Sequence, residues 1–235
     1  MSQYRCALIT GASLGLGAAF ARALAAESVS LVLAARSQDQ LTTLEHELLQ
    51  AHYVKRRLRS PAKVTTIAVD LALPDGADQL HELLGPQADQ VDLLINNAGF
   101  GSFGSLAELG AENEAEMIML NCVSLLKLTR AFLPQMIRHG RGGIINVAST
   151  AAFQPVPRMA TYAATKAFVS SFSQAVNCEM RSTGVHLLTL CPGPTATSFF
   201  ERAGFFFTLS LTSSTPIIIP LCLASPTNFK LKNLS

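Results

Sequence analysis

The chain has 235 residues and a formal net charge of +2, with 49% hydrophobic and 14% charged residues. This composition excludes a disordered protein, and the length allows one domain whose core needs neither disulfides nor a metal. The small net charge excludes a dedicated nucleic-acid face. Because no apolar run reaches about 18 residues, no membrane-spanning helix is expected.

From the first residues onward, apolar runs alternate with segments of helical spacing. In the first helical segment, for example, Leu16, Phe20 and Leu24 recur on one helix face. In chain order, we predict strand Tyr4–Thr10, helix Gly15–Glu27, strand Val29–Ala35, helix Gln38–Ala51, strand Lys63–Asp70, a helix from Pro74 to about Ala88, strand Val91–Ile95, helix Glu112–Arg138, strand Gly143–Ala148, helix Ala160–Arg181 and strand Val185–Leu190. This alternation indicates an α/β fold, a doubly wound parallel sheet of six recognisable strands with helices on both faces. The strands are continuous apolar runs, as expected for burial on both sides.

Cysteine and histidine usage indicates a reduced compartment without a metal site. The five cysteines are odd in number and show no CxxC or zinc spacing, and the five histidines show no metal-ligand spacing. The first residues lack the charged and apolar regions of a signal peptide. We therefore expect a cytoplasmic protein with buried free thiols.

A glycine-rich turn follows the first predicted strand. It runs from Thr10 through Gly11, Gly15 and Gly17, between a strand and a helix. Such glycines let backbone N–H groups approach a pyrophosphate, which the N-terminus of the next helix also attracts. By itself a glycine triplet indicates only a tight turn, but its position in a βαβ unit favours a dinucleotide site.

The spacing of these glycines resembles the TGxxxGxG loop of the short-chain dehydrogenase/reductase family, and further motifs match that family in the same order. They are Asp70-Leu71 after the third strand, Asn96-Asn97-Ala98-Gly99 after the fourth, Asn121 in the next helix, Ser149 at the end of the fifth strand, the YxxxK motif from Tyr162 to Lys166, and Pro192-Gly193 after the sixth strand. The resemblance covers about residues 4–202. It implies a Rossmann-type domain over residues 1–202, similar to bacterial NADP-dependent members.

The resemblance also implies a set of cofactor contacts. They are Gly11, Ser13, Gly15, Leu16, Gly17, Arg36, Asp70, Leu71, Asn97, Ala98, Gly99, Tyr162, Lys166, Pro192, Gly193, Thr195 and Thr197. The second predicted strand ends in Ala34-Ala35-Arg36 without an acid, so nothing there repels a 2′-phosphate. Arg36 offers it a guanidinium and Ser13 a further donor, which favours NADP(H) over NAD(H). The alternative for Arg36 is an ordinary surface arginine.

The predicted catalytic residues are Asn121, Ser149, Tyr162 and Lys166. Hydride transfer to a carbonyl requires a proton donor, and tyrosine, with a reference pKa of about 10, exchanges protons poorly at neutral pH. Lys166 lies one helical turn after Tyr162, so its ammonium is expected to lower the pKa of the phenol. By resemblance, Tyr162 is the acid/base, Lys166 also holds the nicotinamide ribose, Ser149 polarises the substrate oxygen and Asn121 supports a proton relay.

The expected substrate is a small carbonyl compound or alcohol, and the side chains predicted near it suit an apolar one. They are Phe100, Phe103, Phe153, Gln154, Pro155, Val156, Met159, Phe199 and Phe200. The alternative for these residues is ordinary core packing.

Residues 203–235 form an atypical tail in which the family's seventh strand is not recognisable. The tail has no acidic residue, and Pro220 interrupts its best strand candidate, which includes Ile217 to Ile219. An altered or truncated C-terminus would leave the substrate lid incomplete and the protein able to bind cofactor but impaired in catalysis. A lipid-facing tail on a membrane-associated reductase is a further alternative, although its prolines break amphipathic spacing. We expect the working enzyme without a membrane partner.

A homodimer is expected by resemblance, through the two long predicted helices Glu112–Arg138 and Ala160–Arg181. On the second helix Phe168, Phe172 and Val176 form an apolar stripe that suits either the core or a partner.

Overall fold

The structure, a computed structural model, describes residues 3–54 and 63–193. The predicted tail, residues 203–235, lies outside the described residues, as do the predicted cofactor contacts Thr195 and Thr197 and the predicted substrate contacts Phe199 and Phe200. The predicted boundary between the domain and the tail therefore stays a prediction.

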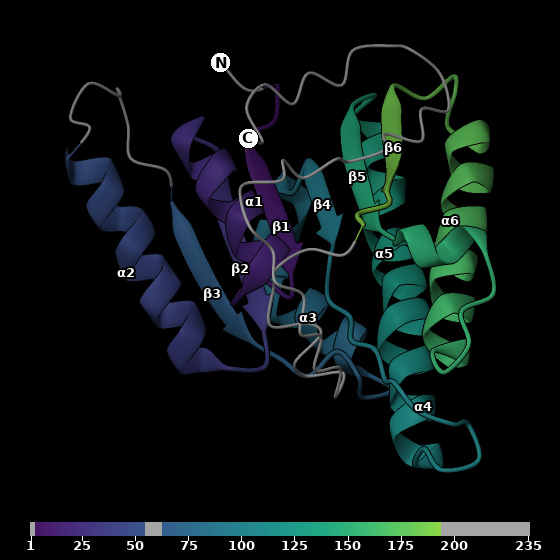
Figure 1. Cartoon of the computed structure of the whole chain (residues 1–235). Coiled ribbons are helices and arrows are strands. Elements are labelled where there is room, and N and C mark those ends of the chain that lie inside the picture. The colour runs from purple at the N-terminus through teal and green to yellow at the C-terminus, as the bar shows by residue number, and fades with distance from the viewer. Residues whose placement is uncertain (1–2, 55–62, 194–235) are drawn as a thin grey trace.

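The described strands form one parallel sheet with the order β3-β2-β1-β4-β5-β6. The strands are β1 (Cys6–Thr10), β2 (Ser30–Ala35), β3 (Val64–Ala68), β4 (Leu93–Asn96), β5 (Gly142–Val147) and β6 (Val185–Leu190). Chain order reverses direction between β1 and β4, which places a topological switch point at the centre of the sheet (Figure 1). Ligands of doubly wound sheets bind beyond the carboxyl ends of the strands at such a point.

Helices cover both faces of this sheet, as predicted. They are α1 (Gly15–Ala26), α2 (Gln38–Val54), α3 (Gly76–Leu84), α4 (Ala111–Ile118), α5 (Leu125–Arg138) and α6 (Ala160–Glu179). On one face Phe20 of α1 and Leu41 of α2 pack with Leu33, whereas on the other Phe132 of α5 and Leu80 of α3 pack with Leu8. Successive strand side chains point to opposite faces, so both faces of each central strand must be apolar.

Two predicted helices differ from those observed. α3 begins at Gly76, and Pro74 lies in the preceding turn. Gly76 packs so closely on the carbonyl of Asp70 that a Cβ would collide there. The long helix predicted over 112–138 is continuous, but a π-helical turn, Met119–Ser124, separates α4 from α5. Such turns insert an extra residue and often occur at functional sites.

The combined helical stretch Ala111–Arg138 is long and apolar enough to cross a membrane. The expectation of no membrane-spanning helix rested on the lack of an uninterrupted apolar run, and it stays a prediction, because this stretch is interrupted by charged residues. The stretch nevertheless packs Leu128, Phe132 and Met136 into the core of the sheet, and a core helix meets the same length and composition criterion. It is weak evidence for a membrane association.

Candidate active site

A cleft of about 840 Å³ opens at the carboxyl ends of the strands. Most residues predicted from sequence line it, namely Gly11, Ser13, Gly15, Leu16, Arg36, Asp70, Leu71, Asn97, Ala98, Gly99, Ser149, Tyr162, Lys166, Pro192 and Gly193. Gly17 and Asn121 do not line the cleft but contact residues that do: Gly17 packs against Gly11, and Asn121 accepts a hydrogen bond from the Phe100 N–H. The fold thus brings the predicted cofactor-binding motifs and the predicted catalytic residues, which are far apart in sequence, into one cleft.

The glycine-rich loop forms the floor of one end of this cleft. Gly11 and Gly15 have φ of +62° and +55°, which only glycine adopts readily. Gly17 packs under the loop, where a Cβ would collide with the Gly11 carbonyl oxygen, so α1 can lie directly beneath the turn. Asn97 secures the loop from β4 by donating its side-chain amide to the carbonyls of Thr10 and Gly11, at 3.0 and 3.1 Å.

The N-terminus of α1 provides free donors at the loop. Its N-cap, Leu14, makes no side-chain capping bond, and the first turn of α1 contains no acidic residue. Backbone N–H groups of an uncapped first turn, together with the helix dipole, attract an anion. The loop and this helix end therefore fit the pyrophosphate of a dinucleotide.

Arg36 lies at the opposite rim of the same end, immediately after β2. Its side chain is half exposed and its Nη1 lies 3.5 Å from Oε1 of Glu116 on α4. Asp70, after β3, also lines the cleft and accepts a hydrogen bond from the Ala72 backbone N–H at 2.9 Å. This end of the cleft therefore carries both a guanidinium and carboxylates.

Ser149 and Tyr162 meet at the other end of the cleft. Ser149 follows β5 and caps a short 3₁₀ turn, Thr150–Phe153, where its Oγ accepts from the Ala151 N–H at 3.1 Å. Burial raises the pKa of Tyr162 above its ordinary value, and a side-chain hydrogen bond with Ser149 lowers it in part. Two hydroxyls placed together in this way can both donate hydrogen bonds to one oxygen atom of a ligand.

Lys166 is buried one helical turn after Tyr162. Its Nζ donates to the Val147 carbonyl at 2.8 Å and lies 5.7 Å from the centroid of the Tyr162 ring. Burial lowers the pKa of Lys166 to about 8, and the thiols of Cys122 and Cys191 raise it in part. Burial raises the pKa of Tyr162 more than its hydrogen bond with Ser149 lowers it, and the predicted lowering by Lys166 stays a prediction.

Asn121 occupies the π-helical turn and is fully used in holding the protein together. Its Oδ1 accepts from the Phe100 N–H at 3.2 Å, and its Nδ2 donates to the Phe100 carbonyl at 2.9 Å and to Thr165 Oγ1 at 3.0 Å. Thr165 in turn donates to the carbonyl of Tyr162 at 2.7 Å. Asn121 thus fixes both the loop after β4 and the turn that carries Tyr162, and its predicted relay role stays a prediction.

Sequence reasoning missed the contribution of α4 to the cleft. Asn113 and Glu116 of α4 line it, as does Leu120 of the π-helical turn that follows. Their spacing places all three on one helix face, which was a usable signal. The signal lay inside a longer apolar pattern that also fitted core packing.

The predicted substrate contacts divide into two groups. Phe100, Gln154, Val156 and Met159 line the cleft beside Tyr162, whereas Phe103, Phe153 and Pro155 do not. Phe103 packs against the apolar cluster of Met117, Met159 and Tyr162, and the Arg158 guanidinium lies 4.8 Å from its ring centroid.

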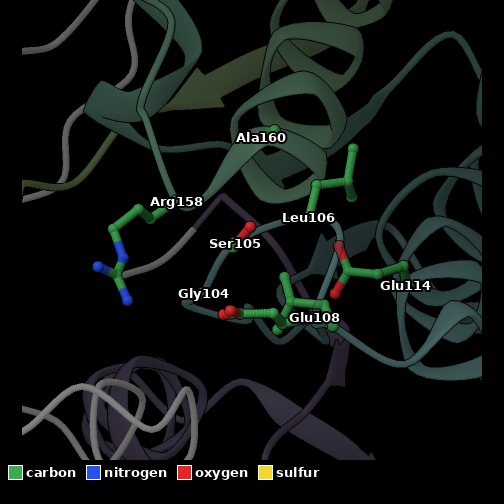
Figure 2. A pocket seen from close by; sticks show the side chains of 8 residues that line it. Gly104, Ser105, Leu106, Glu108, Glu114, Arg158 and Ala160 are labelled. Atoms are coloured by element: carbon green, nitrogen blue, oxygen red, sulfur yellow. The ribbon is translucent and has the colours of Figure 1, made fainter.

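A second cavity of about 440 Å³ lies between Gly104–Leu109, Glu114 and the start of α6, with Arg158 at its edge (Figure 2). The carboxylate of Glu114 is buried there and accepts from Ser102 Oγ at 2.6 Å. Ser149, Tyr162 and Lys166 do not line this cavity. The larger cleft is therefore the candidate active site.

Comparison with known proteins agrees with this geometry. A model of the short chain dehydrogenase family matches residues 5–204. A very-long-chain 3-oxoacyl-CoA reductase of Mus musculus is 33% identical over 196 residues, which are 81% of this chain and 59% of that protein. An uncharacterized oxidoreductase of Staphylococcus epidermidis is 29% identical over 201 residues, 86% of this chain and 82% of its own length. The chain thus spans about three fifths of the mouse reductase.

Two solved structures are also similar. A short-chain dehydrogenase from Sphingobium yanoikuyae in complex with NADPH has a TM-score of 0.78 and 34% identity, covering 86% of this chain and 75% of that one. An alcohol dehydrogenase from Thermococcus sibiricus complexed with 5-hydroxy-NADP has a TM-score of 0.74 and 30% identity, covering 84% and 79%. The parallel sheet, the cleft and the match over residues 5–204 lead to one conclusion: the chain belongs to the short-chain dehydrogenase family.

Proposed function

We propose that the protein is an NADP(H)-dependent oxidoreductase that transfers hydride between the nicotinamide and a carbonyl compound or secondary alcohol. The observation that carries this proposal is the placement of Ser149, Tyr162 and Lys166 in the same cleft as the glycine-rich loop. The relatives named as 3-oxoacyl-CoA reductase and alcohol dehydrogenase support the reaction class. We assign it to residues 1–202.

The nicotinamide dinucleotide fits the residues present. The loop from Gly11 to Gly17 and the start of α1 would hold its pyrophosphate, and Lys166, Pro192 and Gly193 line the part of the cleft where its nicotinamide ribose would lie. When bound, it supplies a hydride to the carbonyl carbon or accepts one from the alcohol carbon.

Tyr162 and Ser149 handle the proton. Because the pKa of Tyr162 is raised by burial, its hydroxyl keeps its proton at neutral pH and can donate it to the carbonyl oxygen as the C–H bond forms. The hydroxyl of Ser149 stabilises the negative charge that develops on that oxygen. The phenolate left on Tyr162 is stabilised by Ser149 and by the nearby ammonium of Lys166.

The proposed substrate is an apolar ketone or aldehyde. Phe100, Val156 and Met159 line the cleft next to Tyr162, so an apolar group beside the carbonyl would be buried against them. Gln154 supplies a polar side chain at the same end.

The test of the proposed function is oxidation of NADPH by the purified full chain with a panel of apolar ketones and aldehydes. Carbonyl-dependent loss of NADPH absorbance, with formation of the matching alcohol, is expected. NADPH binding without turnover on any carbonyl would overturn the proposal and select the alternative, a cofactor-binding protein impaired in catalysis.

We predict that Arg36→Ala weakens NADPH binding about ten-fold or more and changes NADH binding by less than two-fold. A charge-assisted bond from the guanidinium to the 2′-phosphate exists only with NADPH. Titration of each cofactor into the protein measures both constants. Arg22→Ala removes an exposed arginine that pairs with Glu47 outside the cleft, and it serves as the control. Equal losses for both cofactors would contradict the assignment of Arg36.

We further propose that the chain forms a homodimer through α5 and α6. Phe168 is partly exposed and its ring stacks on Phe172, with centroids 5.8 Å apart. Leu126 and Ile137 of α5 are also exposed, whereas Val176 lies in the core and so leaves the predicted stripe. An apolar face repeated by a two-fold axis buries itself on a second copy.

Light scattering at several protein concentrations is expected to show a dimer, and the double variant Leu126→Glu, Phe168→Glu is expected to shift it to a monomer. The partly exposed side chains allow the variant to fold, which circular dichroism checks. A dimer unchanged by both substitutions would contradict this interface. A discrete tetramer independent of concentration would show that residues 203–235 build a second interface.

A further inference from the structure

Arg36 and Glu116 form an ion pair between two walls of the cofactor cleft. Both residues line the cleft, and Nη1 of Arg36 lies 3.5 Å from Oε1 of Glu116. Arg36 follows β2, whereas Glu116 belongs to α4, 80 positions later in the chain. The same guanidinium that is suited to a 2′-phosphate is therefore already paired with a carboxylate.

Glu116 reaches this position because of the face of α4 on which it lies. It shares the cleft-lining face with Asn113 and Leu120. The other acidic side chains of α4 do not compete for Arg36: Glu112 is exposed outside the cleft, and Glu114 is buried against Ser102. Asp70 is the other described carboxylate that lines the cleft, and its Oδ1 is held by the Ala72 N–H.

The ion pair between Arg36 and Glu116 is weak enough for another anion to replace the carboxylate. A distance of 3.5 Å and partial exposure of both side chains indicate a weak contact that water and salt screen. A guanidinium binds carboxylate and phosphate oxygens through the same fork of N–H groups, so the two anions compete for it.

We infer that Glu116 is a specificity-determining residue. Its carboxylate competes with the 2′-phosphate of NADP(H) for Arg36 and so reduces the preference of the protein for NADP(H) over NAD(H). This inference rests on the proposed function. A 2′-phosphate must displace the carboxylate or accept its repulsion at short range. A 2′-hydroxyl leaves the ion pair in place, because it brings no charge.

The test is the substitution Glu116→Gln, which keeps the shape of the side chain and removes its charge. Dissociation constants for NADP⁺ and NAD⁺ are measured by calorimetric titration without a carbonyl substrate. We expect NADP⁺ to bind about two- to five-fold more tightly, the range given by exposed ion pairs, and NAD⁺ to change by less than that. Glu112→Gln removes the same charge from the same helix outside the cleft and is expected to change neither constant by as much.

A double-mutant cycle with Arg36→Ala separates competition from a general charge effect. In the Arg36→Ala background, most of the gain from Glu116→Gln is expected to disappear. An equal gain in both backgrounds, or equal gains for both cofactors, would overturn the inference. Weaker NADP⁺ binding by Glu116→Gln would also overturn it and would make Glu116 a positioning residue for Arg36.

These outcomes are distinct from a failure of the proposed function. Failure of both dinucleotides to bind the wild-type chain would overturn the proposed function and the inference together. Binding of both dinucleotides without the expected response to Glu116→Gln would overturn the inference alone. Because no carbonyl is present, the result does not depend on turnover.

Discussion

The variant Tyr162→Phe is expected to lose turnover by about 10²- to 10⁴-fold, while its NADPH dissociation constant stays within about two-fold of wild type. The range is that of a positioned acid or base. The ring of Tyr162 packs with Met117 and Met159, and phenylalanine keeps that packing. Only the hydroxyl that meets Ser149 and supplies the proton is removed. Steady-state rates of NADPH oxidation, with binding measured separately, check both parts.

Tyr4→Phe is the matched control for this variant. Tyr4 precedes β1, at the opposite end of the strands from the cleft, so the same loss of one hydroxyl occurs away from the site. Its turnover is expected to match wild type. Retention of more than about a tenth of wild-type turnover by Tyr162→Phe would remove Tyr162 from the acid/base role.

The variant Lys166→Met is expected to lose turnover while remaining at least as stable as wild type at pH 7. Lys166 is buried, and its lowered pKa of about 8 shows that folding disfavours its charge. A shift of this size corresponds to about 3 kcal/mol of free energy. The hydrogen bond from Lys166 to the Val147 carbonyl stabilises the fold by about 1 kcal/mol. Losing this bond in Lys166→Met therefore costs less than is gained by no longer burying a charge.

The pH dependence of stability gives a sharper test of the same group. Below about pH 8 Lys166 is protonated in both the folded and the unfolded chain, so folding of wild type carries the full free-energy cost of burying the ammonium. Between about pH 8 and 10.5 the unfolded chain holds more protons, so the free energy of unfolding of wild type rises with pH relative to Lys166→Met. Burial raises the pKa of Cys6 to about 11, and its titration acts on both proteins in the same way. Burial also raises the pKa of Cys122 to about 11, but Lys166 lowers it in part, so the comparison is read below that pH.

Denaturant unfolding of both proteins across this pH range measures the difference. We expect the free energy of unfolding of wild type to rise by up to about 3 kcal/mol relative to that of Lys166→Met as the pH increases. A difference that is constant with pH would contradict a lowered pKa for Lys166. Turnover by Lys166→Met within ten-fold of wild type would contradict its role beside Tyr162.

Much of the fold follows from patterns that are local in sequence. The predicted strand over 185–190 matches β6, and the others agree within a few residues, because strands buried on both faces are uninterrupted apolar runs. The start of α3 could not be placed in the same way. At this start Gly76 packs closely against the Asp70 carbonyl, a tertiary contact that spacing does not reveal.

The candidate active site likewise contains residues that local sequence patterns predict and features that depend on tertiary packing. Ser149, Tyr162 and Lys166 were predictable because they stand in short motifs at strand ends and on one helix face, and the fold brings these positions together. The π-helical turn around Asn121 and the partnership of Glu116 with Arg36 depend on tertiary packing. The spacing of Tyr162 and Lys166 indicates a nearby ammonium but does not reveal the burial that raises the pKa of Tyr162.

The most direct measurement of the proposed hydride transfer is the fate of a labelled hydride. The full chain is incubated with NADPH deuterated at the transferable position of the nicotinamide and with an apolar ketone, and the product is analysed by mass spectrometry. Hydride transfer from the nicotinamide gives an alcohol with a single deuterium at the carbinol carbon, and no such product is expected with Tyr162→Phe over the same time. An unlabelled alcohol, or NADPH that binds and is never consumed, would contradict it.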